Sequence, residues 1–291
     1  LNPRAGANQN ATYSPDGKQI AFSSSASGFS QIYMANADGS GVRRLTNTRA
    51  VEVEPKINPK TGNEIVFVSG RGGGSPQVYK MNIDGADVQR LSTGEGQATN
   101  PSWNPQGTHI AFAWTRGYDP GNFNIFVMDV NTREYVQLTS GSGRNENPTW
   151  APDGKSVAFI SDRTGIAQVF LYDFDTKQHF QLTKLVGGVA SVTENSPAMT
   201  WARQADKLAF VYMDNGDYTV WSIANPRQLK KEPFAVPTAT VAAVPAAAAP
   251  QKVVLQLKWR HQFQFAGYYA ALEQGFYRQA GLDVEIREGG P

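Results

Sequence analysis

Residues 147–163 read NPTWAPDGKSVAFISDR, which is the pattern of a β-hairpin. A short strand is expected to end at Trp150, and a second, apolar strand is expected from Val157 to Ile160. The turn between them has the residues that tight turns favour: proline fixes φ near −65°, Asp153 can bond to its own backbone, and Gly154 accepts a positive φ. This pattern recurs along the chain, and the recurrence indicates the fold.

Five copies of the hairpin pattern are recognisable. They begin at Asn10, Glu54, Asn100, Asn147 and Asn195. The phenylalanine of the second strand occurs at Phe22, Phe67, Phe112, Phe159 and Phe210. The steps between these phenylalanines are 45, 45, 47 and 51 residues. A period of this length is typical of a β-propeller blade.

Two further signals keep the same period. An amide, an apolar residue and an aromatic residue follow each other at 31–33, 77–79, 124–126 and 168–170. A leucine followed by threonine or serine occurs at 45–46, 91–92, 138–139 and 182–183. Each period therefore contains four strand candidates. We predict an all-β fold, a β-propeller of four-stranded blades, with five blades recognisable and a sixth left open.

The composition divides the chain into three parts. Residues 1–232 contain the repeats, and residues 233–251 form a linker rich in alanine and proline. Residues 252–291 have a different pattern, with strands expected at 253–257 and 282–286 and a helix at 267–274. A strand-helix-strand order predicts a parallel pair of strands, and hence a short α/β segment.

Charge and cysteine content exclude several classes of function. The net charge is +2 and the lysines and arginines are scattered, so nucleic acid is not an expected partner. There is no cysteine, and therefore no disulfide or thiolate metal site. No apolar stretch reaches the roughly 20 residues needed to span a bilayer. The first residue is Leu1, so we expect a processed product or a fragment.

The sequence motifs of these repeats resemble those of the TolB-type β-propeller repeat. The resemblance rests on the Ser/Ala-Pro-Asp-Gly-Lys turns, the Ile-Ala-Phe strands, the Ser161-Asp162-Arg163 loop and the Gln-Ile-Tyr triplet, and it covers about 220 residues. The family's propeller has six blades, lies in the periplasm and binds the lipoprotein Pal. The resemblance implies a periplasmic scaffold that docks a protein partner, in an envelope or membrane-associated complex.

The last forty residues resemble the start of a periplasmic solute-binding protein of the thiamine-pyrimidine-precursor type. The resemblance rests on sequence motifs at residues 255–259, 264–269, 275–277 and 281–284. It implies an alternative function, a solute-binding or sensor component to which the propeller is an appendage. A third reading is that the two parts do not belong to one gene product.

The sequence gives no reason to expect an enzyme, a metal or a cofactor. The nucleophile motif G-x-S-x-G of prolyl-oligopeptidase-like enzymes is absent. The histidines His109, His179 and His261 are isolated and do not have ligand spacing. Residues 214–217 read DNGD but lack the ligand pattern of an EF-hand loop, and a hairpin turn is the simpler interpretation.

Polar residues at the start of each first strand are the candidate site. The innermost strands of a propeller line its channel, so their first residues are expected around one channel mouth. The predicted partner-binding residues are Glu54, Asn100, Glu146, Asn147, Glu194 and Asn195. The aromatic residues that end these strands, and the loop arginines Arg71, Arg116 and Arg163, are interpreted as structural.

Overall fold

The computed structural model describes residues 6–141, 143–192, 196–202, 204–214, 216–235, 251–256 and 282–287. The chain divides into two compact units, Leu1–Phe234 and Ala235–Pro291. Glu194, Asn195, Asn215 and His261, which the sequence analysis names, lie outside the described residues.

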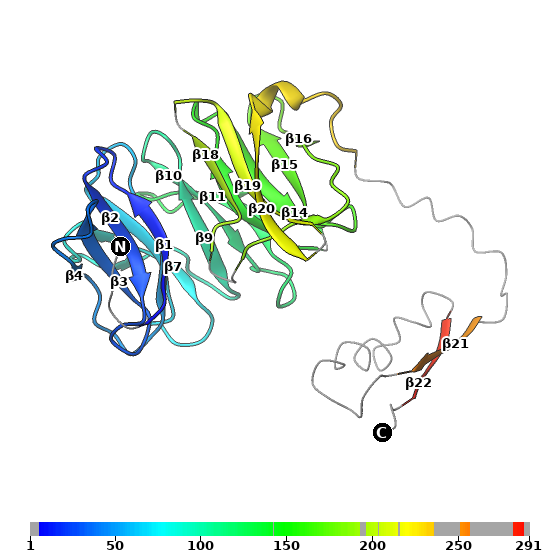
Figure 1. Ribbon diagram of the computed structural model, residues 1–291, viewed down its shortest axis with the longest axis horizontal. Coiled ribbons are helices and arrows are strands. Elements are labelled where there is room, and N and C mark those ends of the chain that lie inside the picture. Colours follow the sequence, from blue (N-terminus) through cyan, green and yellow to red (C-terminus); the bar gives the residue numbers. More distant parts are fainter. Residues whose placement is uncertain are drawn as a thin grey trace. The chain divides into compact units, whose positions relative to one another are not determined.

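The first unit consists of five consecutive antiparallel sheets, each one a propeller blade (Figure 1). The first blade consists of β1 (Asn8–Tyr13), β2 (Gln19–Ser24), β3 (Gln31–Asn36) and β4 (Arg43–Arg44), and the second of β5 (Glu52–Ile57), β6 (Glu64–Ser69), β7 (Gln77–Asn82) and β8 (Gln89–Arg90). The third consists of β9 (Ala98–Trp103), β10 (His109–Trp114), β11 (Asn124–Asp129) and β12 (Tyr135–Gln137). The fourth consists of β13 (Asn145–Trp150), β14 (Ser156–Ser161), β15 (Gln168–Asp173) and β16 (Gln178–Gln181). The predicted all-β propeller of four-stranded blades is confirmed, with five blades among the described residues.

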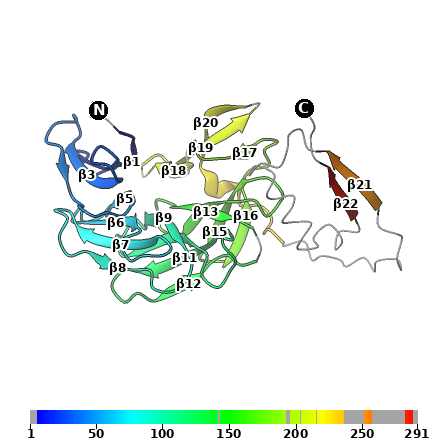
Figure 2. The ribbon, with the colours of Figure 1, turned by 90° about the horizontal axis from the view of Figure 1, so that it is seen from below.

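The inner strands β1, β5, β9, β13 and β18 face a common centre (Figure 2). Each of the first four packs beside the inner strand of the next blade. Four hydrophobic clusters lie between neighbouring blades, and a fifth lies within the first blade. One cluster, for example, joins Val66 and Val78 of the second blade to Trp103 and Phe112 of the third.

The repeated amide and hydroxyl residues hold the outer part of each blade together through hydrogen bonds. In the second blade, the Ser92 hydroxyl donates to the Gln77 side chain at 2.7 Å and accepts from the Val78 backbone N–H at 2.8 Å. The fourth blade repeats this with Thr183, Gln168 and Val169. Because each polar group is buried, its hydrogen bonds must be made within the blade. This requirement explains the two periodic signals in the sequence.

The fifth blade differs from the others. Its strands are β17 (Gly188–Val189), β18 (Met199–Ala202), β19 (Lys207–Asp214) and β20 (Asp217–Ala224), followed by the 3₁₀ helix η1 (Pro226–Leu229). β17 and β18 both pair with β19 on one side, and β20 pairs with it on the other. No further blade lies beyond β20 among the described residues. Its side chains Val220 and Trp221 are accordingly 76% and 54% exposed.

In the second unit the structure describes two strands, β21 (Gln251–Gln256) and β22 (Leu282–Arg287). They pair in parallel, with Val253 opposite Val284, as the strand-helix-strand pattern predicts. The expected helix at 267–274 lies outside the described residues.

Candidate functional site

The third residue of each of the first four inner strands has a left-handed backbone. The residues are Asn10, Glu54, Asn100 and Asn147, with φ between 51° and 58°. Each strand shifts register against its neighbour at this point, which marks a β-bulge. Asparagine tolerates this conformation better than most residues, so the recurrent Asn has a backbone reason. Glu54 is the exception.

These residues also connect one blade to the next. Glu54 accepts hydrogen bonds from the backbone N–H and the side-chain amide of Asn100, at 2.6 and 3.3 Å. Asn100 in turn accepts from the Asn147 N–H at 3.3 Å, and Asn147 accepts from the Ala198 N–H at 3.3 Å. The bulge turns the side chains of Glu54, Asn100 and Asn147 toward the following blade. The Asn10 side chain instead accepts a hydrogen bond from Ser23 of its own blade. The amides therefore have a structural role in addition to any contact with a partner.

Glu54 is an unusual group within this series. The residue is only 5% exposed, and this burial raises the pKa of its carboxyl group to about 7. Hydrogen bonds from Asn100 and the charge of Lys56 oppose the shift. Burial correspondingly lowers the pKa of the Lys56 ammonium, against the charge of Glu54. A carboxyl group and an amine thus influence each other at the centre of the propeller.

Two cavities meet at Glu54, Asn100 and Asn147, which line both of them. The strand-start cavity, on the side where the inner strands β9 and β13 begin, has a volume of about 870 Å³. Its lining combines polar residues with apolar ones: Gln97, Thr99, Arg144, Glu146, Asp162, Phe123, Ile160, Ala167 and Val189–Val192.

A charged pair stands at the edge of the strand-start cavity. The Arg144 guanidinium donates to the Glu146 carboxylate at 2.6 and 3.1 Å and lies 5.9 Å from the centre of the Phe123 ring. The Arg144 backbone N–H donates to Asp162 at 2.8 Å. The Arg144 side chain is 60% exposed, so it is available to another molecule.

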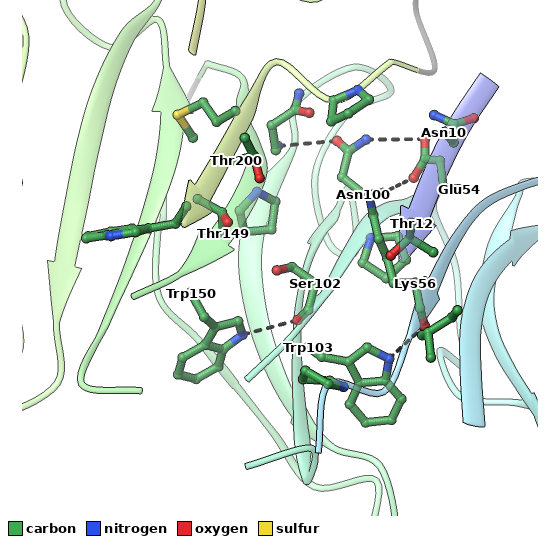
Figure 3. Close-up of a pocket in the computed structure, with 18 of the residues that line it drawn as sticks. Asn10, Thr12, Glu54, Lys56, Asn100, Ser102, Trp103, Thr149, Trp150 and Thr200 are labelled. Carbon is green, nitrogen blue, oxygen red and sulfur yellow. Dashed lines mark hydrogen bonds between the residues drawn. The ribbon is translucent and has the colours of Figure 1, made fainter. Parts of the chain in front are cut away.

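The strand-end cavity lies on the other side of Glu54 and has a volume of about 550 Å³ (Figure 3). Trp103 and Trp150 contribute to its lining but are more than 90% buried, because each packs against the preceding blade. The indole N–H of Trp103 donates to the Lys56 carbonyl at 2.9 Å, and that of Trp150 donates to the Ser102 carbonyl at 3.1 Å. The prediction that these tryptophans pack between blades is confirmed. Tyr13, at the same position in the first blade, is 59% exposed.

The loop arginines cap the aromatic residues of their own blades. Arg71 lies 5.3 Å from the centre of the Phe67 ring and forms an ion pair with Glu52 at 3.1 Å. Arg163 lies 4.8 Å from the centre of the Phe170 ring, and burial lowers its pKa to about 10. These contacts agree with a structural role.

Among the described residues, no three histidine, aspartate or glutamate side chains gather in a way that could hold a metal ion. His179 is partly buried, which lowers its pKa to about 4, and its ring lies against Phe159. His109 is the first residue of β10, and its Nε2 lies 3.7 Å from the Asp129 carboxylate.

The structure brings together four of the six predicted site residues, Glu54, Asn100, Glu146 and Asn147, around the strand-start cavity. Glu194 and Asn195 lie outside the described residues. The sequence analysis did not single out Arg144 or Lys56. Lys56 could have been found by aligning the repeats, because it replaces a hydroxyl residue that the other four copies have before their aromatic position.

Five consecutive blades around a polar centre define a β-propeller with two open cavities on its axis. The TolB beta propeller domain family matches residues 2–119 and 94–257, and the chain belongs to this family. A second, shorter match, to the NMT1/THI5 like family, covers residues 262–291.

Individual relatives agree with this assignment. An uncharacterized protein of Agrobacterium fabrum is 42% identical over 64 residues, which is 22% of each chain. The Tol-Pal system protein TolB of Anaeromyxobacter dehalogenans is 46% identical over 43 residues, 15% of this chain and 10% of the relative. These matches therefore span about a fifth or less of the relatives' length. Among solved structures, a putative TolB from Agrobacterium tumefaciens has 21% identity and a TM-score of 0.64, over 76% of this chain and 78% of that one.

Proposed function

We propose that this chain is a non-catalytic docking propeller of the bacterial envelope, which binds a protein partner at the strand-start cavity. The proposed location is the periplasm, and the proposed partner belongs to an envelope or membrane-associated complex. The relationship to a protein of the Tol-Pal system supports this proposal. Among the described residues, no helix has the length and apolar character needed to cross a bilayer.

The observation that carries the proposal is the combination of charged and apolar groups in the strand-start cavity. Arg144 and Glu146 stand at its edge, while Phe123, Ile160 and Val189 provide apolar surface. Protein interfaces use arginine and aromatic residues as anchors within a polar rim. A cavity of about 870 Å³ has room for a loop or a peptide segment of a partner.

The proposal of a non-catalytic role rests on the contacts that Glu54 and His179 already make within the propeller. Glu54 has a pKa suited to acid-base chemistry, but both of its carboxylate oxygens accept hydrogen bonds from Asn100. His179 is held neutral within the aromatic packing of the fourth blade. The alternative of a solute-binding component depends on residues 252–291, of which the NMT1/THI5 like match covers 262–291, and it is not favoured.

The test is binding of the soluble domain of the Pal lipoprotein from the same organism, measured by isothermal titration calorimetry. We expect Arg144→Ala to weaken binding by about tenfold, which corresponds to about 1.4 kcal/mol. Glu146→Gln should weaken it less, because the side chain keeps its shape and hydrogen-bonding capacity. The matched control is Arg43→Ala, since Arg43 is an exposed arginine of the outer strand β4. Unchanged affinity in both cavity variants, or an equal loss in the control, would contradict the proposed docking site.

A further inference from the structure

The residue before the aromatic position of each inner strand, which Ile57 occupies in the second blade, points to a second site. In the five blades these residues are Thr12, Lys56, Ser102, Thr149 and Thr200. All five line the strand-end cavity. Figure 3 shows Thr12 and Lys56 on one wall of the cavity, Thr149 and Thr200 on the opposite wall, and Ser102 between them. The repeat thus builds a ring of four hydroxyl groups and one ammonium group, which we call the hydroxyl ring.

The polar side chains of the hydroxyl ring form no hydrogen bonds within the described part of the chain, although the charge of Glu54 acts on Lys56. None of the four hydroxyl groups forms a hydrogen bond, and the Lys56 ammonium forms neither a hydrogen bond nor an ion pair with any described side chain. Glu54, the carboxylate that influences Lys56, directs both oxygens to Asn100. In contrast, Lys80 of the same blade forms an ion pair with Glu64 at 3.1 Å.

Lys56 is partly buried, and the charge of Glu54 acts on it without an ion pair between the two side chains. Burying an ammonium group without a directly paired counter-ion is costly. An anion in the cavity would relieve this cost, and hydroxyl groups can donate hydrogen bonds to it. The arrangement favours an anion that carries a single negative charge. Lys56 is the one cation of the hydroxyl ring, and the Glu54 carboxyl group, two residues away, repels a dianion more strongly than a monoanion when it is ionised.

We propose that the strand-end cavity binds a carboxylate, which pairs with the Lys56 ammonium and accepts hydrogen bonds from the hydroxyl ring. The carboxylate belongs either to a small organic acid or to the C-terminus of a peptide. The cavity of about 550 Å³ accommodates a ligand of either kind. This site lies on the side of Glu54 away from Arg144, so it is distinct from the docking site proposed above, although Glu54, Asn100 and Asn147 line both cavities.

The experiment is an NMR titration of the full chain with acetate, at constant ionic strength and with chloride as the reference anion. We expect saturable shifts at Lys56, Ser102 and Thr149, and a rise in the pKa of Lys56 when acetate is bound. Inorganic phosphate at pH 8, where it is mainly a dianion, should bind at least fivefold more weakly than acetate.

Substitutions at the hydroxyl ring test whether acetate binds there. We expect Lys56→Met to reduce acetate affinity at least tenfold, and Thr149→Val to reduce it about threefold. Lys60→Met, which removes an exposed lysine from the turn after β5, is the matched control and should bind acetate normally. If Lys56→Met fails to fold, the pKa of Lys56 in the unmodified protein is measured with and without acetate, and a rise with acetate shows that the anion binds beside Lys56. An unchanged pKa, or equal binding by Lys56→Met and Lys60→Met, would overturn the proposal.

Two peptides distinguish the sources of the carboxylate. N-acetyl-triglycine with a free C-terminus is compared with its C-terminal amide. If the free acid binds more tightly than acetate and the amide does not bind, a peptide terminus is the ligand class. If acetate and the free acid bind equally, a small organic acid is favoured. Binding of the amide as tight as that of the acid would contradict a carboxylate site.

Discussion

The fourth blade and the fifth blade share one repeat pattern but differ in what covers them. β15 of the fourth blade pairs with β14, and β20 of the fifth pairs with β19 in the same register. By this register Val220 corresponds to Val169, yet Val169 is fully buried and Val220 is 76% exposed. The difference is the neighbour, because the fifth blade packs on the fourth, while β20 has no blade beyond it among the described residues.

The first blade shows the same effect at the opposite end of the series. Its Tyr13 is 59% exposed, whereas Trp150, at the same position of the fourth blade, is 9% exposed. The aromatic side chain at this position packs on the preceding blade, as the bond from Trp150 to the Ser102 carbonyl shows. The repeat pattern therefore specifies the blade, and the adjacent blade determines how much each position contributes to stability.

The largest effect expected from this comparison is at the aromatic position. Trp150 stacks on Phe174 with ring centres 5.3 Å apart and donates a hydrogen bond to the third blade. Trp150→Ala should lower the free energy of unfolding by about 3–5 kcal/mol, since it leaves a cavity between two blades. Tyr13→Ala should change it by less than about 0.5 kcal/mol. Urea denaturation followed by circular dichroism measures both, and equal losses would show that the position matters irrespective of its neighbour.

Much of the fold could be predicted from local chemistry. The turn residues, the apolar second strands and the amide-hydroxyl pairs each act within one blade, so their signals lie within one repeat. The pairing of Phe159 with Phe170 follows from this local order.

The candidate site was less predictable because its properties arise between blades. Asn100 and Asn147 are recognisable as polar residues at strand starts, but the hydrogen bonds that connect them to other blades join residues 46 or more positions apart. The pKa of Glu54 depends on burial by blades that the sequence does not place. Arg144 carries no repeat signal. Lys56 does carry one, as the copy that departs from the hydroxyl pattern.

The second expected effect is at the third position of the inner strands, where the second blade departs from the third and fourth. Glu54 stands where these blades have asparagine, and burial raises its pKa from 4.5 to about 7. The folded state therefore keeps the proton to higher pH than the unfolded state does. The stability that this provides is present below pH 4.5 and is lost as the pH rises to about 7. At about 1.4 kcal/mol for each pKa unit, the loss across this window is roughly 3 kcal/mol.

Urea denaturation at several pH values between 5 and 8 checks this expectation, with Glu54→Gln as the matched variant. Glutamine keeps the shape of the side chain but cannot ionise. The decrease in the free energy of unfolding with rising pH should become shallower in Glu54→Gln by the contribution of one group. If both proteins show the same pH dependence, the raised pKa of Glu54 does not contribute to stability.

The smallest effect compares the buried valine with its exposed counterpart. Val169→Thr places a hydroxyl group in the core shared by the fourth and fifth blades, and should cost about 2 kcal/mol in the free energy of unfolding. Val220→Thr keeps a β-branched residue on β20 and should change stability by less than about 0.5 kcal/mol. Chemical denaturation measures both variants under one condition. A large loss in Val220→Thr would mean that the outer face of β20 is covered in solution, for example by another copy of the chain. Repeating the measurement at several protein concentrations would detect such self-association, because only an intermolecular contact makes the denaturation midpoint depend on concentration.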